Sequence, residues 1–217
     1  MDYENKPEGY YDNVRSEMLE FLPAGAKRIL DVGCGNGAFA QIIKEKNQAE
    51  VWGIEYINEH GLEAHKKLDT VYIGKCEDFI EGLPNNYFDV IYCNDVLEHL
   101  VDPYWVLSIL KNKLSENGKI ISSLPNVRFY KSFIKVLLYK NWEYEDYGIM
   151  DRTHLRFFTK KSIKKMYEDL GFEIVTHKGI NKSKSLKPYL FYALTLFTQL
   201  DMRYVQFATV AKVANEN

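Results

Sequence analysis

The fold is decided by the stretch Ile29-Leu30-Asp31-Val32-Gly33-Cys34-Gly35-Asn36-Gly37-Ala38. It begins as a short, mostly apolar run typical of a buried strand, continues through three closely spaced glycines, and leads into a helical pattern at residues 38–46. Glycines in such a turn let the backbone approach a bound nucleotide closely, and the helix that follows offers unpaired N–H groups. The stretch therefore predicts a strand, a nucleotide-binding turn and a helix.

Short apolar runs alternate with helical patterns on either side of this stretch, which predicts a parallel sheet covered by helices. A helix at residues 10–21 is expected to precede the first strand. Asp102 and Pro103 have the types of an N-cap and a first-turn proline for a helix at 104–114, which Asn117-Gly118 is expected to end. The strands of this first part are expected at residues 28–32, 51–55, 71–74, 88–93 and 119–123.

The alternation stops after the fifth strand. Residues 125–159 are rich in aromatic and charged side chains, and we interpret them as an insertion with one helix at 129–138. Thr159 is then expected to cap a helix that reaches Leu170. The remaining segments are predicted as a strand at 172–177, a basic polar loop at 178–187, an apolar helix at 189–200 and a last strand at 204–213.

The length of 217 residues favours one α/β domain with an elaboration. We divide it into a leading helix (1–27), a first sheet half (28–124), the insertion (125–159) and a C-terminal part (160–217). With 28 basic and 30 acidic residues, the chain shows no overall electrostatic preference for nucleic acid, and we expect no nucleic-acid partner.

The three cysteines are widely spaced and form no C-x-x-C pair, so we expect neither a disulfide framework nor a metal site. The N-terminus is polar and acidic, and no apolar run reaches the roughly 18 residues that span a bilayer. The expectation is a soluble, cytoplasmic protein.

Asp31 helps to discriminate between the cofactors that fit a glycine turn. Gly33, Gly35 and Ala38 also satisfy the G-x-G-x-x-A pattern of dinucleotide-binding loops. However, the carboxylate of Asp31 at the end of the first strand would repel a pyrophosphate and attract a sulfonium or ammonium group. S-adenosylmethionine carries both cations and no phosphate. Glu55, about 20 residues further on, is placed to accept ribose hydroxyls in either kind of site.

The motif at residues 31–37 resembles the first motif of class I S-adenosylmethionine-dependent methyltransferases. Residues 88–99 resemble the fourth-strand motif of that family, and residues 206–212 resemble its final antiparallel strand. The resemblance implies an α/β, Rossmann-like fold with a seven-stranded mixed sheet of order 3-2-1-4-5-7-6, helices on both faces and an acceptor-side insertion after the fifth strand. It places the ligands where the order reverses, between the first and fourth strands.

The resemblance also implies the residues that bind S-adenosylmethionine, or S-adenosylhomocysteine as the product. Many relatives have aspartate where this chain has Lys75, so we expect Glu77 or Asp78 to make the adenine contact. Tyr11 and Arg15 of the leading helix are expected to close over the donor. The remaining predicted donor-binding residues are Asp31, Gly33, Cys34 and Gly35 for the methionine end, Glu55 and Tyr56 around the ribose, Cys76 near the adenine, and Asn94, Asp95 and Val96 at the exit of the fourth strand.

Methyl transfer to an alcohol requires removal of the hydroxyl proton, for which histidine is the usual side chain. Of the five histidines, His99 follows the fourth strand at the switch point, and His154 lies in the unusual stretch 151–159. Either residue is a candidate general base. For His60, His65 and His177 we favour surface or packing roles.

The insertion is expected to hold the acceptor, with Arg128, Tyr130, Arg152 and Arg156 as candidate binding residues. In the alternative, Asp151 pairs with Arg152 or Arg156 and the loop is only structural. Residues 10–15, 124–128 and 148–159 resemble a subgroup of bacterial methyltransferases associated with glycosyltransferases and surface-polysaccharide assembly. That resemblance implies O-methylation of a sugar or sugar-linked hydroxyl.

Other functions stay open at this point. They are methylation of another small molecule, an NAD-dependent oxidoreductase, and a non-catalytic module that binds S-adenosylmethionine. The lysines of residues 178–187 and the apolar residues after them could contact an anionic membrane, or they could form a solvated loop and a packed helix. We expect a monomer or a homodimer.

Overall fold

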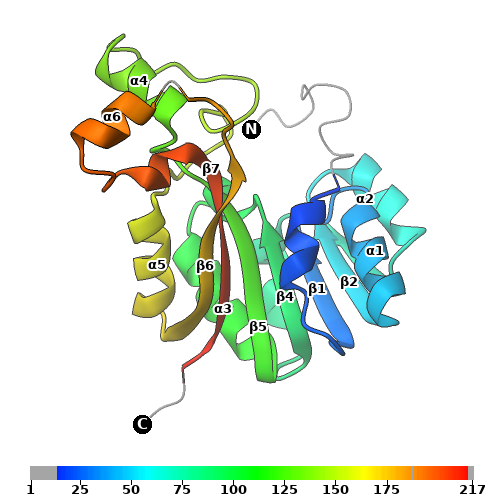
Figure 1. Ribbon diagram of the computed structural model, residues 1–217. Coiled ribbons are helices and arrows are strands. Elements are labelled where there is room, and N and C mark those ends of the chain that lie inside the picture. The colour runs from blue at the N-terminus through cyan, green and yellow to red at the C-terminus, as the bar shows by residue number, and fades with distance from the viewer. Residues whose placement is uncertain (1–13, 187, 215–217) are drawn as a thin grey trace.

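A seven-stranded sheet forms the centre of the computed structural model, which describes residues 14–186 and 188–214 (Figure 1). The strand order is β3-β2-β1-β4-β5-β7-β6, as the resemblance implied. β7 runs antiparallel to both of its neighbours, and the other neighbouring pairs are parallel. The strands are β1 Arg28–Val32, β2 Glu50–Glu55, β3 Thr70–Ile73, β4 Phe88–Asn94, β5 Leu114–Pro125, β6 Phe172–Lys182 and β7 Tyr204–Val213.

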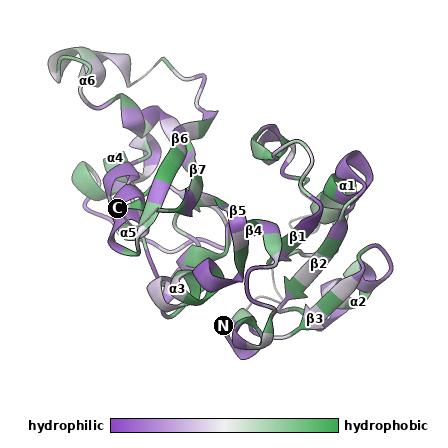
Figure 2. Cartoon of the chain, turned by 90° about the horizontal axis from the view of Figure 1, so that it is seen from below, coloured by the Kyte–Doolittle hydropathy of each residue, from purple (hydrophilic) through white to green (hydrophobic). Residues whose placement is uncertain are grey.

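Helices cover both faces of the sheet because successive strand residues point to opposite sides. Leu30 packs with the residues of α3 and α5 on one face, whereas its neighbour Ile29 packs with η2 and α1 on the other. Figure 2 shows α1 and α3 on opposite sides of the strands. The helices are η2 Ser16–Phe21, α1 Ala38–Asn47, α2 Asn58–His65, η3 Cys76–Asp78, η4 Ile80–Gly82, η5 Leu97–His99, α3 Pro103–Lys113, α4 Tyr130–Leu137, α5 Lys160–Asp169, α6 Tyr189–Leu194 and η6 Leu200–Arg203.

The two predicted N-caps, Asp102 and Thr159, are confirmed. The Asp102 side chain accepts a hydrogen bond from Trp105 N at 2.9 Å, and Pro103 is the first residue of α3. Thr159 caps α5 through a reciprocal pair of hydrogen bonds with Ser162. These signals depend on residues within one helical turn, so the sequence alone could place them.

The predicted end of α3 at Asn117-Gly118 is wrong. The helix ends at Lys113, and Leu114 already pairs with Phe88 as the first residue of β5. The last carbonyls of the helix are satisfied by the loop before β4, because Tyr87 N donates to Lys113 O at 2.9 Å. No glycine cap is required when another segment supplies the donors.

The C-terminal part also differs from the prediction. Residues 178–182 continue β6 instead of forming a loop, because β7 offers backbone partners as far as Tyr204, which pairs with Lys182. The predicted helix at 189–200 ends at Leu194. In the leading segment, only Ser16–Phe21 is helical within the described residues, as a 3-10 helix.

The insertion and the C-terminal helices pack together as a cap beyond the carboxyl ends of β5 and β6 and the amino end of β7 (Figure 1). We use "cap" for residues 126–158 and 183–203. The predicted insertion helix is present as α4. Phe129, Tyr130 and Met150 of the insertion form one apolar cluster with Tyr192 and Met202. Among the described residues, no helix is long and apolar enough to cross a membrane.

Candidate active site

A cavity of about 960 Å³ lies at the carboxyl ends of the central strands. Its walls come from the turn after β1, the end of β2, the segment after β3, the exit of β4, and the insertion. β1 and β4 are neighbours in the sheet although they are not consecutive in the chain, so this is the switch point of the topology. Ligands of open α/β sheets bind at such a point.

The glycine turn forms the floor of this cavity. Gly33 has φ of +75°, a backbone conformation that favours glycine, and the N–H groups of Gly33 and Cys34 donate to Ile54 O of β2. A Cβ on Gly33 would lie 2.4 Å from Cγ2 of Val96, which follows β4. The missing side chain therefore permits the close approach of the two strand exits.

Two buried carboxyl groups lie beside the turn. Asp31 and Glu55 are 3% and 6% exposed. Burial, followed by the nearby charge of Glu55, raises the pKa of Asp31 to about 8. Burial also raises the pKa of Glu55, although Glu55 accepts hydrogen bonds from Ile57 N and Gly35 N, each at 2.8 Å. A cation in the cavity would stabilise the ionised form of both groups.

The exit of β4 carries an unusual pair of residues. Neither the oxygen nor the nitrogen of the buried Asn94 amide has a hydrogen-bond partner in the described structure, and buried amides are normally bonded. Asp95 has φ of +54°, a strained conformation for a residue other than glycine. Its carboxylate accepts from Gln206 Nε2 at 2.6 Å and forms an ion pair with Arg15. Both features indicate a site built for a ligand.

The segment after β3 places only some of the predicted adenine-binding residues at the cavity. Cys76 and Glu77 line it, together with Lys75, and Asp78 does not. Cys76 Sγ lies 3.3 Å from Glu77 Oε2, and burial raises the pKa of this thiol. Of the two acids that we expected at the adenine, the structure therefore offers Glu77.

His99 and His154 meet on the cavity wall, with ring centroids 4.8 Å apart. His99 Nδ1 lies 3.1 Å from Thr153 O, and His154 Nδ1 lies 3.0 Å from Ile149 O. The insertion is held against this wall because Leu155 N and Arg156 N both donate to the Glu98 carbonyl oxygen. Two histidines that are 55 positions apart in the chain thus form one group.

Glu98 is the site residue that sequence reasoning missed. Its side chain is 1% exposed, and burial raises its pKa to about 8, while Arg15 acts to lower the pKa and Asp151 to raise it. Glu98 Oε1 lies 4.0 Å from His154 Nε2. The only signal in the sequence was its place between Leu97 and His99, which does not reveal that the carboxyl group is buried.

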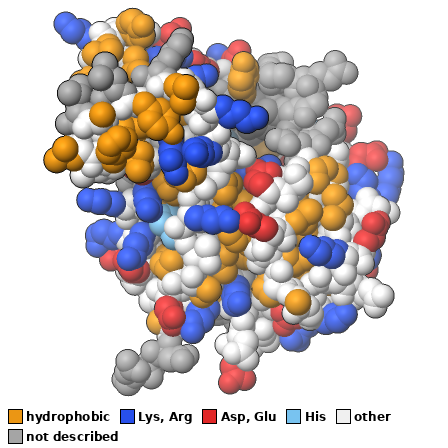
Figure 3. All heavy atoms as spheres, viewed as in Figure 1, with side chains coloured by type: hydrophobic (Ala, Val, Ile, Leu, Met, Phe, Trp, Pro, Cys, Tyr) orange, Lys and Arg blue, Asp and Glu red, His pale blue; other side chains and the backbone are white. Residues whose placement is uncertain are grey.

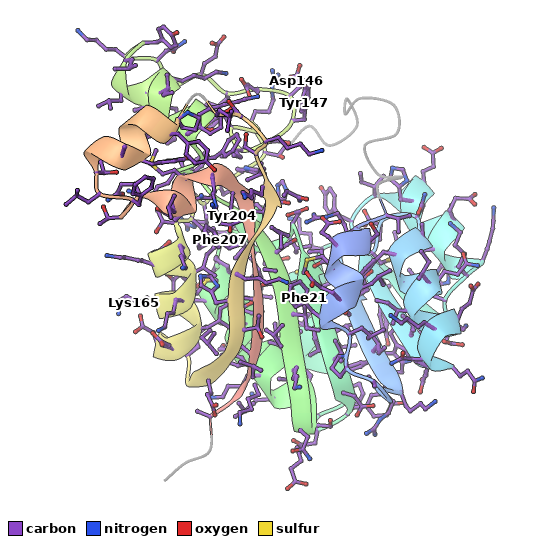
Figure 4. All side chains as sticks on the ribbon, viewed as in Figure 1. Phe21, Asp146, Tyr147, Lys165, Tyr204 and Phe207 are labelled. Atoms are coloured by element: carbon purple, nitrogen blue, oxygen red, sulfur yellow. The ribbon has the colours of Figure 1, made fainter. Side chains whose placement is uncertain are left out.

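The four predicted acceptor-binding residues do not line the cavity. Arg128 donates to Asp201 and Gln199, Arg152 pairs with Asp146, and Arg156 donates to the Val101 carbonyl. Figure 4 shows Asp146 on the insertion, beyond the carboxyl ends of the strands. Tyr130 is buried in the apolar cluster of the cap.

The remaining predicted residues have varied positions. Arg15 lines the cavity but is tied to the ends of β4 and β5 and to the start of β7 through Asp95, Ser123 and Gln206. Tyr11 lies outside the described residues. Asp151 accepts from Thr153 N and Oγ1, and these contacts brace the loop. Besides Arg15, the predicted residues that line the cavity are Asp31, Gly33, Cys34, Gly35, Glu55, Tyr56, Cys76, Glu77, Asn94, Asp95, Val96, His99 and His154.

Comparison with known proteins agrees with this architecture. A family model described as a methyltransferase domain matches residues 4–177. The chain belongs to this methyltransferase family. The methyltransferase also has the fold of a solved S-adenosylmethionine-dependent methyltransferase from Archaeoglobus fulgidus, with a TM-score of 0.68 and 21% sequence identity over 93% of this chain and 94% of that one.

Curated relatives of the methyltransferase carry the name ubiquinone biosynthesis O-methyltransferase. The protein from Neisseria meningitidis serogroup C (strain 053442) is 29% identical over 164 residues, which are 71% of this chain and 67% of the relative. The protein from Aeromonas salmonicida (strain A449) is 26% identical over 190 residues, or 83% of this chain and 78% of the relative. The resemblance to class I methyltransferases is thus confirmed, whereas these relatives are not named for polysaccharide assembly.

The cofactor of the methyltransferase is S-adenosylmethionine, and the described residues fit it. The buried acids Asp31 and Glu55 suit a ligand with an ammonium and a sulfonium group. The Asn94 amide offers a donor and an acceptor that have no hydrogen-bond partner among the described residues. The missing side chain at Gly33 lets Val96, which also lines the cavity, pack closely against the turn.

The substitution Gly33→Ala is expected to weaken S-adenosylmethionine binding about tenfold and to cost about 1–2 kcal/mol of stability, since the positive φ and the contact with Val96 both resist a Cβ. Calorimetric titration and urea unfolding measure the two effects. Gly25→Ala is the matched control, because Gly25 has φ of +83° with nothing within 4 Å of its Cβ position. Equal donor affinity in the two variants would contradict the role of the close approach.

Proposed function

We propose that the methyltransferase transfers the methyl group of S-adenosylmethionine to a hydroxyl oxygen of a small molecule. The observation that carries this proposal is the group formed by Glu98, His99 and His154, which shares one cavity with the glycine turn. When bound, S-adenosylmethionine supplies an electrophilic methyl group on its sulfonium. The protein has to align the acceptor with this methyl group and remove the hydroxyl proton.

His154 is the proposed base. A carbonyl oxygen cannot donate, so the contact with Ile149 O means that His154 Nδ1 carries the proton and Nε2 holds the lone pair. Nε2 is the atom nearest to the Glu98 carboxyl group. A carboxylate at this position would stabilise the imidazolium formed when Nε2 takes the hydroxyl proton. His99 has the same tautomer by the same reasoning and is the rival base.

The acceptor class is part of the proposal. The names of the relatives favour a ring hydroxyl of a ubiquinone precursor. The resemblance of residues 148–159 to polysaccharide-associated methyltransferases favours a sugar hydroxyl instead. Because the arginines that would bind an anionic sugar have other partners, we place the ring hydroxyl first and the sugar hydroxyl second.

A methyl-labelled donor tests the function directly. Purified protein is incubated with the labelled donor and with dihydroxybenzoates, phenols and nucleotide sugars in turn, and the products are identified by mass spectrometry. We expect a methyl ether of a ring hydroxyl. Labelling on nitrogen, or donor binding without transfer to any acceptor, would contradict O-methylation, and quenching of NADH fluorescence by the protein would favour an oxidoreductase.

We also propose that the cap contacts a lipid surface from one side. Leu138 and Tyr139 after α4 are 66% and 74% exposed, and Leu196 after α6 is 84% exposed. Figure 3 shows apolar side chains gathered over this region with lysines and arginines around them, the pattern of interfacial binding. We expect sedimentation with anionic vesicles that falls severalfold in Leu138→Glu. Leu62→Glu, on the exposed side of α2, is the control.

A further inference from the structure

Three side chains that can ligate a metal ion meet on the cavity wall. Glu98 and His99 belong to η5, directly after β4, and His154 comes from the insertion. One potential ligand atom of each residue lies within 4.8 Å of those of the other two. The group is thus assembled by the fold from two separate segments and faces the same cavity as the glycine turn.

The Glu98 carboxylate lacks the partners that a buried carboxylate requires. Its side chain is 1% exposed, and neither Oε1 nor Oε2 has a hydrogen-bond partner in the described structure. Charges in protein interiors are normally paired or coordinate metals, because burial without compensation costs several kcal/mol. His154 Nε2 at 4.0 Å is too distant for a hydrogen bond. Among the described residues, no side chain donates a hydrogen bond to this carboxyl group, which leaves both oxygens available to a bound cation.

Both histidines are oriented as metal ligands usually are. His99 Nδ1 donates to Thr153 O and His154 Nδ1 donates to Ile149 O, so each neutral ring carries its lone pair on Nε2. A histidine that binds a metal typically donates its other ring N–H to a carbonyl or carboxylate, which holds the ring in place. Two main-chain carbonyls perform this function here.

We propose that Glu98, His99 and His154 bind one divalent transition-metal ion, with Zn²⁺ as the best match to two imidazoles and one carboxylate. The ligand atoms lie within 4.8 Å of one another, and His154 Nε2 lies 4.0 Å from Glu98 Oε1. Tetrahedral coordination with bonds of ~2.1 Å places ligand atoms about 3.4 Å apart, so the side chains would draw together around the ion as it binds. Three protein ligands leave a fourth coordination position for a water molecule or an acceptor hydroxyl from the cavity.

The catalytic role of the ion rests on the proposed function, whereas ion binding does not. A bound ion would lower the pKa of an acceptor hydroxyl. The hydroxyl oxygen would then form its bond to the methyl carbon as the S–C bond breaks, and its proton would leave to water. In this arrangement Nε2 of His154 is a ligand, so the ion replaces His154 as the group that activates the hydroxyl.

Metal titration of the full-length protein tests the site. After treatment with a chelator, the protein is titrated with Zn²⁺ by calorimetry and with Co²⁺ by visible absorption. We expect one ion per chain, with an affinity at least tenfold lower in Glu98→Gln and in His154→Gln. His65→Gln is the control for nonspecific metal binding to a surface histidine, because His65 is exposed on α2 and does not line the cavity.

Far-UV circular dichroism verifies that each variant is folded. Glu98→Gln keeps the size of the side chain and replaces its carboxyl group with a neutral amide, so we expect it to fold. Equal metal affinity of Glu98→Gln and the parent, or binding of less than one ion per chain, would overturn the site. Full methyl transfer after chelation would overturn the role of the ion and leave the proposed function intact. Metal binding that depends on Glu98, without methyl transfer to any acceptor, would support the site and count against the proposed function.

Discussion

Asp31→Asn is expected to weaken S-adenosylmethionine binding at least 100-fold and, at the same time, to stabilise the ligand-free protein. The loss of affinity follows from removing a carboxylate that is 3% exposed and lies beside the position of a cationic ligand. In such a buried site an ion pair is screened little by solvent, and 100-fold corresponds to about 2.7 kcal/mol. Calorimetric titration with S-adenosylmethionine measures this effect.

The gain in stability follows from the pKa of Asp31. Burial, with a further contribution from Glu55, raises this pKa to about 8 in the folded protein, whereas an unfolded chain has about 3.9. Between these values the folded state binds more protons than the unfolded state. The stability associated with the protonated group is therefore complete below about pH 4 and is lost as the pH rises toward 8.

The Asp31→Asn variant has no carboxyl group at this position, so it does not lose stability in this way as the pH rises toward 8. Each unit of pKa difference corresponds to about 1.4 kcal/mol, so we expect the variant to be more stable than the parent by on the order of a few kcal/mol at pH 8 and by little at pH 4. Urea unfolding of the ligand-free proteins at both pH values gives the comparison. A parent protein whose stability does not fall between these pH values would contradict the raised pKa.

Asp89→Asn is a control, because its expected effect on stability at pH 8 is opposite to that of Asp31→Asn. Burial acts to raise the pKa of Asp89, but hydrogen bonds from Lys27 N and Arg28 N outweigh it and lower the pKa. Asp89 therefore stabilises the fold above its unfolded pKa and loses this contribution in acid. Asp89 does not line the cavity, so its substitution is expected to destabilise the protein at pH 8 and leave donor binding unchanged.

His154→Ala is expected to lower kcat by about 100-fold to 10,000-fold while the donor affinity changes less than threefold. His154 lines the cavity from the insertion, and its Nε2 lies 4.0 Å from Glu98 Oε1, whereas the glycine turn comes from the end of β1. Steady-state kinetics with the accepted hydroxyl compound measures kcat, and calorimetry measures donor binding. Both roles proposed for His154, base and metal ligand, require this loss, and the metal titration separates them.

Two further variants serve as comparisons for His154→Ala. His99→Ala tests the rival base, and a larger loss of kcat there than in His154→Ala would assign the proton transfer to His99. His65→Ala removes an exposed histidine outside the cavity and is expected to retain full activity. If His154→Ala also kept the kcat of the parent, His154 would have no place in the reaction.

Local patterns predicted most of the fold. The sequence alone predicted the turn after β1, the start of α3 at Asp102-Pro103 and the N-cap Thr159 of α5. Each of these features depends on neighbours within a few residues. The errors lie where distant segments compete with local preference. Tyr87 supplies the donor that ends α3, and the pairing with Tyr204 extends β6 through a lysine-rich segment.

The sequence by itself determined the donor half of the site, because Asp31, the glycines and Glu55 lie within one strand, turn and strand unit whose geometry follows from local backbone preferences. Only the tertiary structure decided the acceptor half. It joined His154 to Glu98 and His99 across 55 positions, gave the predicted arginines other partners, and buried a carboxylate that the sequence shows as an ordinary acid. Burial and long-range contact depend on how the whole chain packs, and they set the charge, the orientation and the chemistry of these side chains.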